Sequence, residues 1–416
     1  MLMLNPGAMR CAYPETLRSI LNMEAAKESE AWLKTWEFIN PHATPTWNLP
    51  DLASDTGVKR VVVKDESKRS SLESFKALGA PVALVRLLMR THPDAGFTAP
   101  ALLRGIHSAE LRHFTVVSAT DGNHGRALAA GARSVGCRCV IVIHRNVSEE
   151  RRAAIAQHGA EVIRIQGSYD ESVVEADRLA REYGWHVVSD TSYEGYETIP
   201  RDVMQGYATI AAEVSVPTSD RGVAFRGGYT HVFIPGGVGG LAAGLVSYFW
   251  EQSAERRPTF VVVEPEQADC LYQSAIRGTA AEASGTVDSV MAGLACGKAS
   301  PLAWRFLRPA VDAFLTIRDS DAVAAMRRLA EGTARDIPML GGESGAASLA
   351  GLLSVAGRAA WRDAIGLDAN SRVLLISTEG ATAPDLYARL SGHSPQNVLS
   401  AQGAWLAHGV GATDVA

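Results

Sequence analysis

The stretch SFKALG at residues 74–79 places one lysine, Lys76, among small and apolar neighbours. A lysine that must join its amine to a flat cofactor ring needs such surroundings, because bulky neighbours would block the approach. A solvated lysine near the start of a helix would give the same short pattern. The stretch therefore has to be weighed together with the segments that could meet it in space.

A second stretch, PGGVGGL at residues 235–241, holds four glycines within five consecutive positions. So many glycines would weaken a regular helix or strand, because each loses more conformational freedom on folding than other residues do. They are expected where the backbone wraps closely around a phosphate with a helix N-terminus behind it. A dinucleotide loop is the competing interpretation, but the GxGxxG spacing is absent and the loop lies late in the chain. The predicted phosphate loop consists of Gly236, Gly237, Val238, Gly239 and Gly240.

The third stretch is SATDGNHG at residues 118–125, between a strand expected at 114–118 and a helix expected at 125–135. A turn in this position can present backbone N–H groups to an anion. The amide of Asn123 can also donate a hydrogen bond to an oxygen of a bound ring. An ordinary capping turn is the alternative, since Asp, Asn and Gly favour turns in any case.

The fourth stretch is STEG at residues 377–380, which ends a predicted buried strand. A hydroxyl group of Ser377 or Thr378 can therefore face a ligand at the carboxyl edge of a sheet. A plain turn at a strand end would have the same sequence. This stretch carries information mainly because it follows the other three in the chain.

Helix-like and strand-like stretches alternate along the chain, which favours an α/β fold with parallel sheets flanked by helices. We predict a larger domain built from residues 1–84 and 196–416, and a smaller βαβ domain at 85–195 inserted into it. The ligand would lie in the cleft between them. Ser148 is expected to cap a helix, and the tail after Gly392 is expected to be weakly structured. The predicted strands are 58–64, 114–118, 139–144, 161–165, 186–189, 229–235, 259–264 and 372–377.

The bulk composition is that of an ordinary globular protein of 416 residues, with 47% hydrophobic and 20% charged residues. A net charge of −5 gives no reason to expect a nucleic-acid partner. No apolar run reaches the roughly 18 residues that span a bilayer, and the N-terminus lacks the basic start of a signal peptide. Five cysteines without metal-binding spacing predict no metal site. The cytoplasm is the expected location.

The four stretches occur in this order in the superfamily of threonine dehydratase and the tryptophan synthase β chain, which this chain resembles. From about residue 40 to 390 it is most similar to the diaminopropionate ammonia-lyase family. Asp121 is the most specific sign, because most relatives have serine there. The stretches that carry the resemblance include DGNHG (121–125), DTSYEGY (190–196), ETIP (197–200), MAGLACG (291–297), GESGAA (342–347) and STEG (377–380).

The resemblance implies a two-domain fold type II enzyme that uses pyridoxal 5′-phosphate (PLP) and is expected to form a homodimer. Lys76 would form the Schiff base with PLP and act as the base for the L-isomer of 2,3-diaminopropionate. Asp121 would act as the base for the D-isomer, and Asp190 would orient the β-ammonium group. The products would be pyruvate and ammonia, formed through aminoacrylate. The remaining implied contacts are Phe75, Asn123, Gly236 to Gly240, Ser377 and Thr378 with the cofactor, and Ser118, Thr120, Asp121 and Asp190 with the substrate.

The sequence departs from the family pattern on both sides of Lys76. SSLES at residues 70–74 replaces an aromatic-Gly-Leu-Asn-Ala run, and Glu73 brings a carboxylate three positions before the lysine. On the other side the family tends to carry Leu-Gly-Gly with a small or aromatic residue, whereas here Leu78 and Gly79 are followed by Ala80 and Pro81. These departures leave the substrate open to another β-substituted amino acid, such as serine or threonine.

Three other interpretations are weighed against this one. A serine or threonine dehydratase or a β-replacement synthase is disfavoured by Asp121 and the DTSYEGY stretch. A binding or regulatory protein that has lost catalysis is disfavoured by the joint presence of Lys76 and Asn123. A Rossmann-type NAD enzyme is disfavoured by the glycine spacing. Cys270 and Cys296 lie in family-like segments, and a disulfide between them and a pair of reduced thiols are both open.

Overall fold

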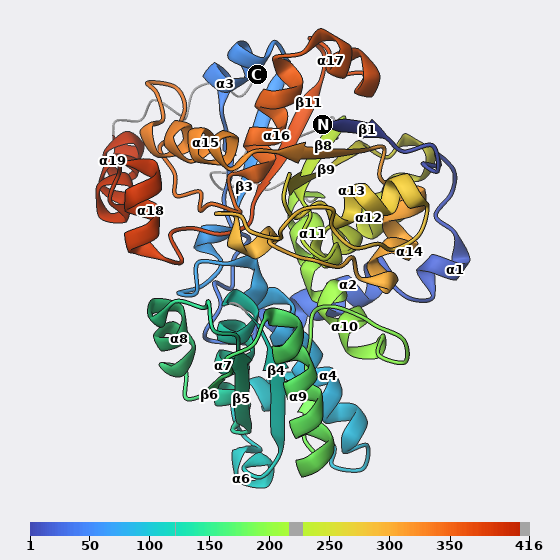
Figure 1. Ribbon diagram of the computed structural model, residues 1–416, viewed down its shortest axis with the longest axis vertical. Helices are drawn as coiled ribbons and strands as arrows, with labels where there is room; N and C mark the ends of the chain where they lie inside the picture. The colour runs from blue at the N-terminus through green and yellow to red at the C-terminus, as the bar shows by residue number, and fades with distance from the viewer. Residues whose placement is uncertain (121, 216–227, 408–416) are drawn as a thin grey trace.

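The computed structural model describes residues 1–416 except residue 121 and the segments 216–227 and 408–416. Two sheets organise the described chain, and Figure 1 shows them in separate lobes. The larger sheet has the strand order β1-β10-β9-β8-β11-β3-β2, in which only the two edge strands run antiparallel to their neighbours. Its strands are β1 (Leu2–Leu4), β2 (Thr46–Asn48), β3 (Arg60–Asp65), β8 (His231–Pro235), β9 (Thr259–Pro265), β10 (Ala313–Ile317) and β11 (Arg372–Ser377).

The smaller sheet has four parallel strands in the order β6-β5-β4-β7. Its strands are β4 (Thr115–Ala119), β5 (Arg138–Ile143), β6 (Glu161–Arg164) and β7 (His186–Val187). In Figure 1 this sheet forms the lower lobe, where α7, α8 and α9 surround it.

Helices cover both faces of the larger sheet. Alternate residues of β11 enter different cores: Leu374 and Ile376 pack on the side of α12, whereas Val373 and Leu375 pack on the side of α16. This is the two-residue period of a strand with both faces buried, which is why the central strands have continuous apolar sequences.

The nineteen α-helices of the described chain and the four short 3₁₀ helices have the following bounds. They are α1 (Glu15–Arg18), α2 (Met23–Leu33), α3 (Pro50–Thr56), α4 (Ala80–Thr91), α5 (Ala99–Leu103), α6 (Ser108–Leu111), α7 (Asn123–Val135), α8 (Glu149–Ala156), α9 (Tyr169–Tyr183), α10 (Thr198–Tyr207), α11 (Thr209–Ser215), α12 (Gly240–Ser253), α13 (Cys270–Arg277), α14 (Pro301–Ala310), α15 (Asp319–Glu331), α16 (Ala347–Ala356), α17 (Ala359–Ile365), α18 (Pro384–Ser391), α19 (Pro395–Ala407), η1 (Glu66–Lys68), η2 (Phe75–Leu78), η3 (Ala254–Arg256) and η4 (Ala292–Leu294).

The predicted strands are confirmed, each within two residues at either end. The cap of α8 is also confirmed, because the Ser148 hydroxyl accepts a hydrogen bond from the Arg151 N–H at 3.2 Å. The three strands β1, β2 and β10 were not predicted. Two of them are three-residue edge strands, whose length gives too little pattern to recognise.

The expectation for the tail was wrong for residues 395–407, while residues 408–416 lie outside the described residues. Residues 395–407 form helix α19, in which Val398 and Gln402 are buried. The Gln402 side chain donates a hydrogen bond to the Pro338 carbonyl at 2.8 Å. This helix lacks a clear apolar stripe, and contacts with the rest of the fold hold it in place. Tertiary contacts of this kind override a weak local pattern.

The domain boundaries remain a prediction. The four-stranded sheet lies within residues 85–195, and the seven-stranded sheet takes strands from both sides of that segment. Helix α4 begins at Ala80 and therefore runs across the predicted boundary after residue 84. No helix in the described ranges is both long and apolar enough to cross a membrane.

Candidate functional site

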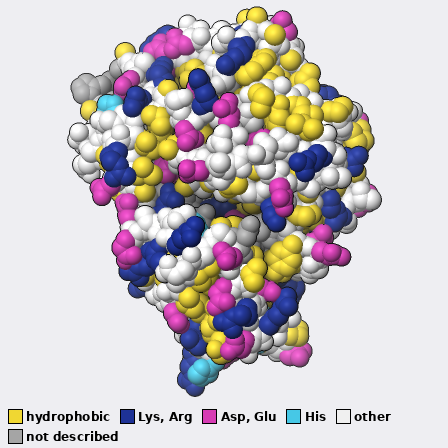
Figure 2. All heavy atoms as spheres, viewed as in Figure 1, with side chains coloured by type: hydrophobic (Ala, Val, Ile, Leu, Met, Phe, Trp, Pro, Cys, Tyr) yellow, Lys and Arg dark blue, Asp and Glu magenta, His cyan; other side chains and the backbone are white. Residues whose placement is uncertain are grey.

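A cavity of about 510 Å³ lies where the carboxyl ends of strands from both sheets converge. Figure 2 shows the surface hollowed between the two lobes. In parallel α/β sheets this is where loops following the strands gather their side chains around a ligand. The cavity is lined by Phe75, Lys76, Thr120, Asn123, Asp190, Gly236, Gly237, Val238, Gly240 and Thr378, among others. Asp121 lies outside the described residues.

Lys76 lies on η2, where the Ser74 hydroxyl accepts a hydrogen bond from the Lys76 backbone N–H at 3.3 Å. Its Nζ donates to Asp190 Oδ2 at 2.5 Å and lies 5.1 Å from the ring centre of Phe75 and 5.5 Å from that of Tyr207. Burial alone would lower the pKa of Lys76, but the Asp190 carboxylate raises this pKa above its ordinary value. The structure therefore pairs two of the predicted catalytic residues.

Asp190 is held in its ionised form. Burial opposes ionisation, yet the Lys76 ammonium group keeps the pKa of Asp190 below its ordinary value. Asp190 follows β7, whereas Lys76 follows β3, so the contact joins the carboxyl ends of the two sheets. A partly buried ion pair costs desolvation, and charged groups with shifted pKa values in a cavity are typical of functional sites.

His124 is a site residue to which the sequence analysis assigned no role. Its Nε2 lies 2.9 Å from the Val188 carbonyl oxygen, which requires a proton on Nε2. The unprotonated Nδ1 then faces Asp190 Oδ2 at 3.8 Å. Burial lowers the pKa of His124, so the ring is neutral at pH 7. The DGNHG stretch contains this histidine, but its orientation depends on a contact with a different strand.

The glycine loop connects β8 to the N-terminus of α12. Gly237 and Gly239 have φ of +62° and +98°, which side chains rarely adopt. A Cβ on Gly239 would come within 2.9 Å of Leu307, and a Cβ on Gly236 within 2.7 Å of Glu264. The loop therefore needs glycine, and it leaves backbone N–H groups and a helix N-terminus available to a phosphate.

Asn123 begins α7 and is held by Glu379. The Asn123 amide donates to Glu379 Oε2 at 2.5 Å, and Glu379 Oε1 accepts from the Ser344 N–H at 3.1 Å. The neighbouring Glu343 is 1% exposed, and its Oε1 lies 3.4 Å from Nη2 of Arg151 on α8. Burial, together with the Glu379 carboxylate, raises the pKa of Glu343 to about 7.

The predicted hydroxyl groups have different surroundings. The Ser377 and Ser118 hydroxyls are buried and have no hydrogen-bond partner in the described ranges. Thr378 lines the cavity. The Thr120 hydroxyl accepts from the N–H groups of Gly122 and Gly125 at 3.3 and 3.4 Å, which makes it part of the turn before α7.

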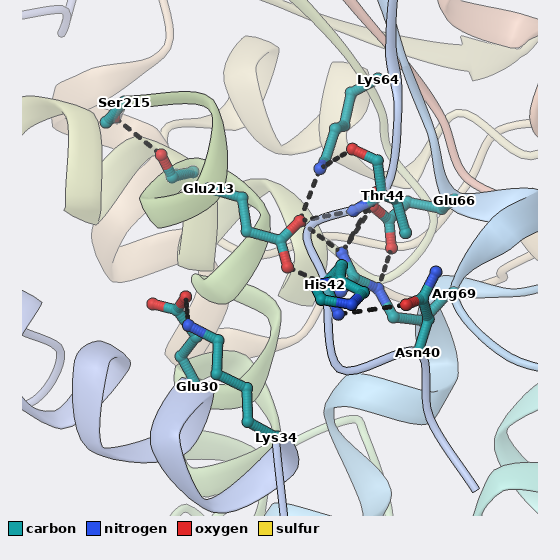
Figure 3. A network of polar contacts seen from close by, with 11 residues as sticks. Glu30, Lys34, Asn40, His42, Thr44, Lys64, Glu66, Arg69, Glu213 and Ser215 are labelled. Atoms are coloured by element: carbon teal, nitrogen blue, oxygen red, sulfur yellow. Dashed lines mark hydrogen bonds and ion pairs between the residues drawn. The ribbon is translucent and has the colours of Figure 1, made fainter. Parts of the chain in front are cut away.

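The segment leading to Lys76 rests on a buried charge network, shown in Figure 3. Lys64 Nζ donates to Glu213 Oε2 at 2.5 Å, and the guanidinium group of Arg69 donates to Glu213 at 2.7 and 2.8 Å. Arg69 also donates to Glu66 at 2.9 Å, and the Thr44 hydroxyl donates to Glu66 at 2.7 Å. The network fixes the end of β3 and η1 against α11, a few residues before Lys76.

The five cysteines all lie among the described residues, and no disulfide joins any of them, Cys270 and Cys296 included. Cys270 is fully buried, and burial raises the pKa of its thiol. No group of three or more His, Cys, Asp or Glu side chains that could hold a metal ion occurs among the residues the structure describes.

The sequence profile of the "pyridoxal-phosphate dependent enzyme" family matches residues 39–379. With this match, the two-lobed α/β fold defines the chain as a PLP-dependent enzyme of fold type II. A diaminopropionate ammonia-lyase of Escherichia coli K12 is 38% identical over 343 residues, which cover 82% of this chain and 84% of that protein. The chain belongs to the diaminopropionate ammonia-lyase family.

Two further relatives agree with this assignment. The diaminopropionate ammonia-lyase of Salmonella typhimurium is 36% identical over 377 residues, covering 89% of this chain and 92% of that protein. A crystal structure of the Escherichia coli enzyme in complex with an aminoacrylate–PLP azomethine intermediate superposes with a TM-score of 0.83. It is 34% identical and covers 94% of this chain and 96% of that one.

The residues present fit PLP. A Cβ at Gly236 or Gly239 would collide with its neighbours, and without one the backbone of this loop leaves space for a phosphate to approach its N–H groups. The buried Ser377 hydroxyl lacks a partner in the described part of the chain, and its neighbour Thr378 lines the cavity, so a hydroxyl at this strand end can face a ring nitrogen. Lys76 offers a primary amine beside this loop in the same cavity.

Proposed function

We propose that this protein eliminates ammonia from 2,3-diaminopropionate with the help of PLP. The released aminoacrylate hydrolyses to pyruvate and a second ammonia. The observation that carries the proposal is the 2.5 Å contact between Lys76 and Asp190 beside the glycine loop. This contact places an amine and a carboxylate side by side in one cavity. The chain is 38% identical to a curated diaminopropionate ammonia-lyase.

PLP, when bound, withdraws electrons from the substrate's α-carbon and makes the proton there removable. We assign Lys76 as the group that holds the cofactor and then accepts this proton on one face of the substrate. The rings of Phe75 and Tyr207 flank its Nζ and limit the positions that the amine can take. Tight placement of a base shortens the path of the proton and contributes to the rate.

We assign Asp190 as the residue that receives the β-ammonium group of the substrate. Lys76 can accept a proton only as a neutral amine. In that state the Asp190 carboxylate has no cationic partner, and the substrate's ammonium group can take the place of the lysine. A carboxylate favours the protonated form of a neighbouring amine. The β-nitrogen must stay protonated to leave as ammonia, which an adjacent Asp190 would promote.

Asp121 remains our proposed base for the D-isomer on the opposite face. Asp121 itself lies outside the described residues; Thr120 and Gly122 line the cavity. Ser118 and Thr120 remain proposed substrate contacts, and Phe75, Asn123, Gly236 to Gly240, Ser377 and Thr378 remain proposed cofactor contacts. A homodimer is expected from the family resemblance, and a cytoplasmic location from the bulk features of the sequence.

The test is an assay of the purified protein with D- and L-diaminopropionate, serine and threonine. Ammonia and the 2-oxo acid, which is pyruvate from diaminopropionate and serine and 2-oxobutyrate from threonine, should form from diaminopropionate much faster than from the two hydroxy amino acids. Lys76→Ala should lose both turnover and the visible absorption band of the lysine-bound cofactor. Equal turnover of serine and diaminopropionate would contradict the substrate assignment, and D-isomer turnover by Asp121→Asn would contradict the base assignment.

A further inference from the structure

The stretch DTSYEGY at residues 190–196 follows β7 and carries Asp190 at its first position. It turns back on itself, because Tyr193 and Tyr196 exchange backbone hydrogen bonds at 2.9 and 3.4 Å around Gly195, whose φ is +78°. The turn returns the side chain of Tyr196 to the strand end from which Asp190 departs.

The hydroxyl group of Tyr196 braces the backbone immediately before Asp190. It donates a hydrogen bond to the Val187 carbonyl at 2.9 Å and accepts one from the Ser189 N–H at 3.0 Å. Burial raises the pKa of this phenol, so the hydroxyl keeps the proton that it donates. One side-chain group thus satisfies two backbone groups beyond the last ladder bonds of β7, and the chain stays fixed up to the residue before Asp190.

The hydroxyl group of Ser192 anchors the backbone immediately after Asp190. It accepts from the Leu302 N–H at 2.9 Å and lies 2.8 Å from the Ser300 hydroxyl. The Ser192 N–H also donates to the Ser300 hydroxyl at 3.2 Å. Both partners lie at the N-terminus of α14, which packs against α12, the helix that begins at the glycine loop. Ser192 therefore fastens the Asp190 segment to the part of the fold that carries the glycine loop.

We propose that the hydroxyl groups of Tyr196 and Ser192 position the Asp190 carboxylate to receive the β-ammonium group of the substrate. The backbone is held on both sides of Asp190, so its carboxylate can move mainly by rotation about its own side-chain bonds. Within that range it meets Lys76 Nζ at 2.5 Å. A group that is fixed in advance loses little freedom when its partner binds and stays at the distance that the partner needs. The inference rests on the proposed function and adds two positioning residues to it.

The test removes each hydroxyl group and keeps the rest of the side chain. Tyr196→Phe retains the ring, which stacks on Tyr193 with 4.8 Å between the ring centres. Ser192→Ala removes the second anchor. Two exposed residues give the matched controls: Tyr183→Phe on α9 and Ser54→Ala on α3. Each hydroxyl variant tests its own anchor, so the test holds if one of them fails to fold.

The first readout compares L-2,3-diaminopropionate with L-3-chloroalanine. Loss of the α-proton and of chloride from the chloro acid gives the same aminoacrylate and therefore pyruvate, but its chlorine offers no cation to Asp190. The readout is the ratio of kcat/KM for pyruvate formation from the diamino acid over the chloro acid. This ratio does not depend on how much of a variant is folded, because both substrates meet the same enzyme molecules.

Each hydroxyl variant should lower this ratio by about tenfold, because a small displacement of a positioned group costs one to two orders of magnitude in rate. The two control variants should keep the wild-type ratio. A merely structural role of the hydroxyl groups would slow both substrates alike and leave the ratio unchanged.

The second readout follows the contact of Lys76 with Asp190 in the cofactor-free protein. Acetic anhydride acylates neutral amines, and the Lys76 side chain is 17% exposed, so the reagent can reach it. Peptide mass spectrometry across a pH series compares its acetylation with that of the exposed Lys59. The Asp190 carboxylate raises the pKa of Lys76, so a loosened carboxylate should move the onset of Lys76 labelling to lower pH in both hydroxyl variants.

A wild-type substrate ratio, or a wild-type onset of Lys76 labelling, in both hydroxyl variants would overturn the proposal. A wild type that forms no pyruvate from diaminopropionate would contradict the proposed function instead. The labelling profiles would then still decide whether Tyr196 and Ser192 hold Asp190 in place.

Discussion

The carboxylate of Glu379 holds the amide of Asn123 at 2.5 Å, although the two residues are 256 positions apart in the chain. Asn123 begins the helix after β4 of the small sheet, and Glu379 follows β11 of the large one. This hydrogen bond therefore lets Glu379, at the end of a strand in the larger lobe, orient the Asn123 amide in the smaller lobe. This relationship makes Glu379 a positioning residue for the cofactor-binding side of the cavity.

Glu379→Ala should weaken PLP binding because the amide of Asn123 is no longer held. A hydrogen bond to a charged group contributes roughly 1.5–3 kcal/mol, so the loss in affinity should be about tenfold or more. Titration of the cofactor-free protein with PLP measures it. Glu255→Ala removes an exposed glutamate on η3 and should bind PLP as the wild type does. Wild-type affinity in Glu379→Ala would contradict the positioning role.

Asp190→Asn should destabilise the cofactor-free protein within a defined pH window. The pKa of Asp190 is lowered from 3.8 and that of Lys76 is raised from 10.5. The ionised Asp190 carboxylate stabilises the folded protein at pH values above its ordinary pKa, and this stabilisation is lost as the pH falls. Stability from the ammonium group is fully present below 10.5 and is lost as the pH rises further.

The difference in thermal unfolding between wild type and Asp190→Asn should accordingly be constant between about pH 5 and 9 and shrink outside that range. Asp288→Asn, an exposed aspartate, serves as control and should follow the wild type throughout. A difference that grows above pH 10.5, the ordinary pKa of lysine, would contradict the ion pair. The same Asp190→Asn variant should raise KM for diaminopropionate.

Glu343→Gln should flatten the pH dependence of stability near neutrality. The pKa of Glu343 is raised from 4.5 to about 7, so ionisation of this buried carboxyl disfavours the folded state. The contribution of Glu343 to the free energy of unfolding therefore falls by up to about 3 kcal/mol as the pH rises from 4.5 to 7. Denaturant unfolding of the cofactor-free protein across this range measures the slope. A variant slope equal to that of the wild type would contradict the assignment.

Gly239→Ala should impair the phosphate loop. The residue has φ of +98°, and the added Cβ would lie 2.9 Å from Leu307 and 3.1 Å from Ala303. Strain and the displaced loop should cost roughly 1–3 kcal/mol of stability and lower PLP affinity at least tenfold. Gly403→Ala is the control, because Gly403 lies in α19 with open space around it. A Gly239→Ala protein with normal PLP affinity would exclude close phosphate contact at this loop.

The sequence predicted those parts of the fold and of the site that depend on a pattern of consecutive residues. The apolar runs identified the central strands, and the four glycines after Pro235 identified a loop with two residues at positive φ. The contact of Lys76 with Asp190 could be anticipated only through the family resemblance.

The contacts of His124 and Glu343 could not be predicted in the same way. Each joins segments that are distant in the chain: His124 with Val188, and Glu343 with Arg151. A local sequence pattern does not specify which atoms of the two lobes meet. Helix α19 was missed for the same reason, because Gln402 is anchored on Pro338 rather than by its own sequence pattern.

The buried network around Glu213 also limits how this chain can change over time. Lys64 and Arg69 balance Glu66 and Glu213, so the four side chains together carry no net charge. Replacing any one of them leaves an uncompensated charge in the interior, which typically costs about 3–5 kcal/mol. Viable variants at these four positions should therefore arise as compensated sets, and libraries that change them one at a time should return almost only the parental residues.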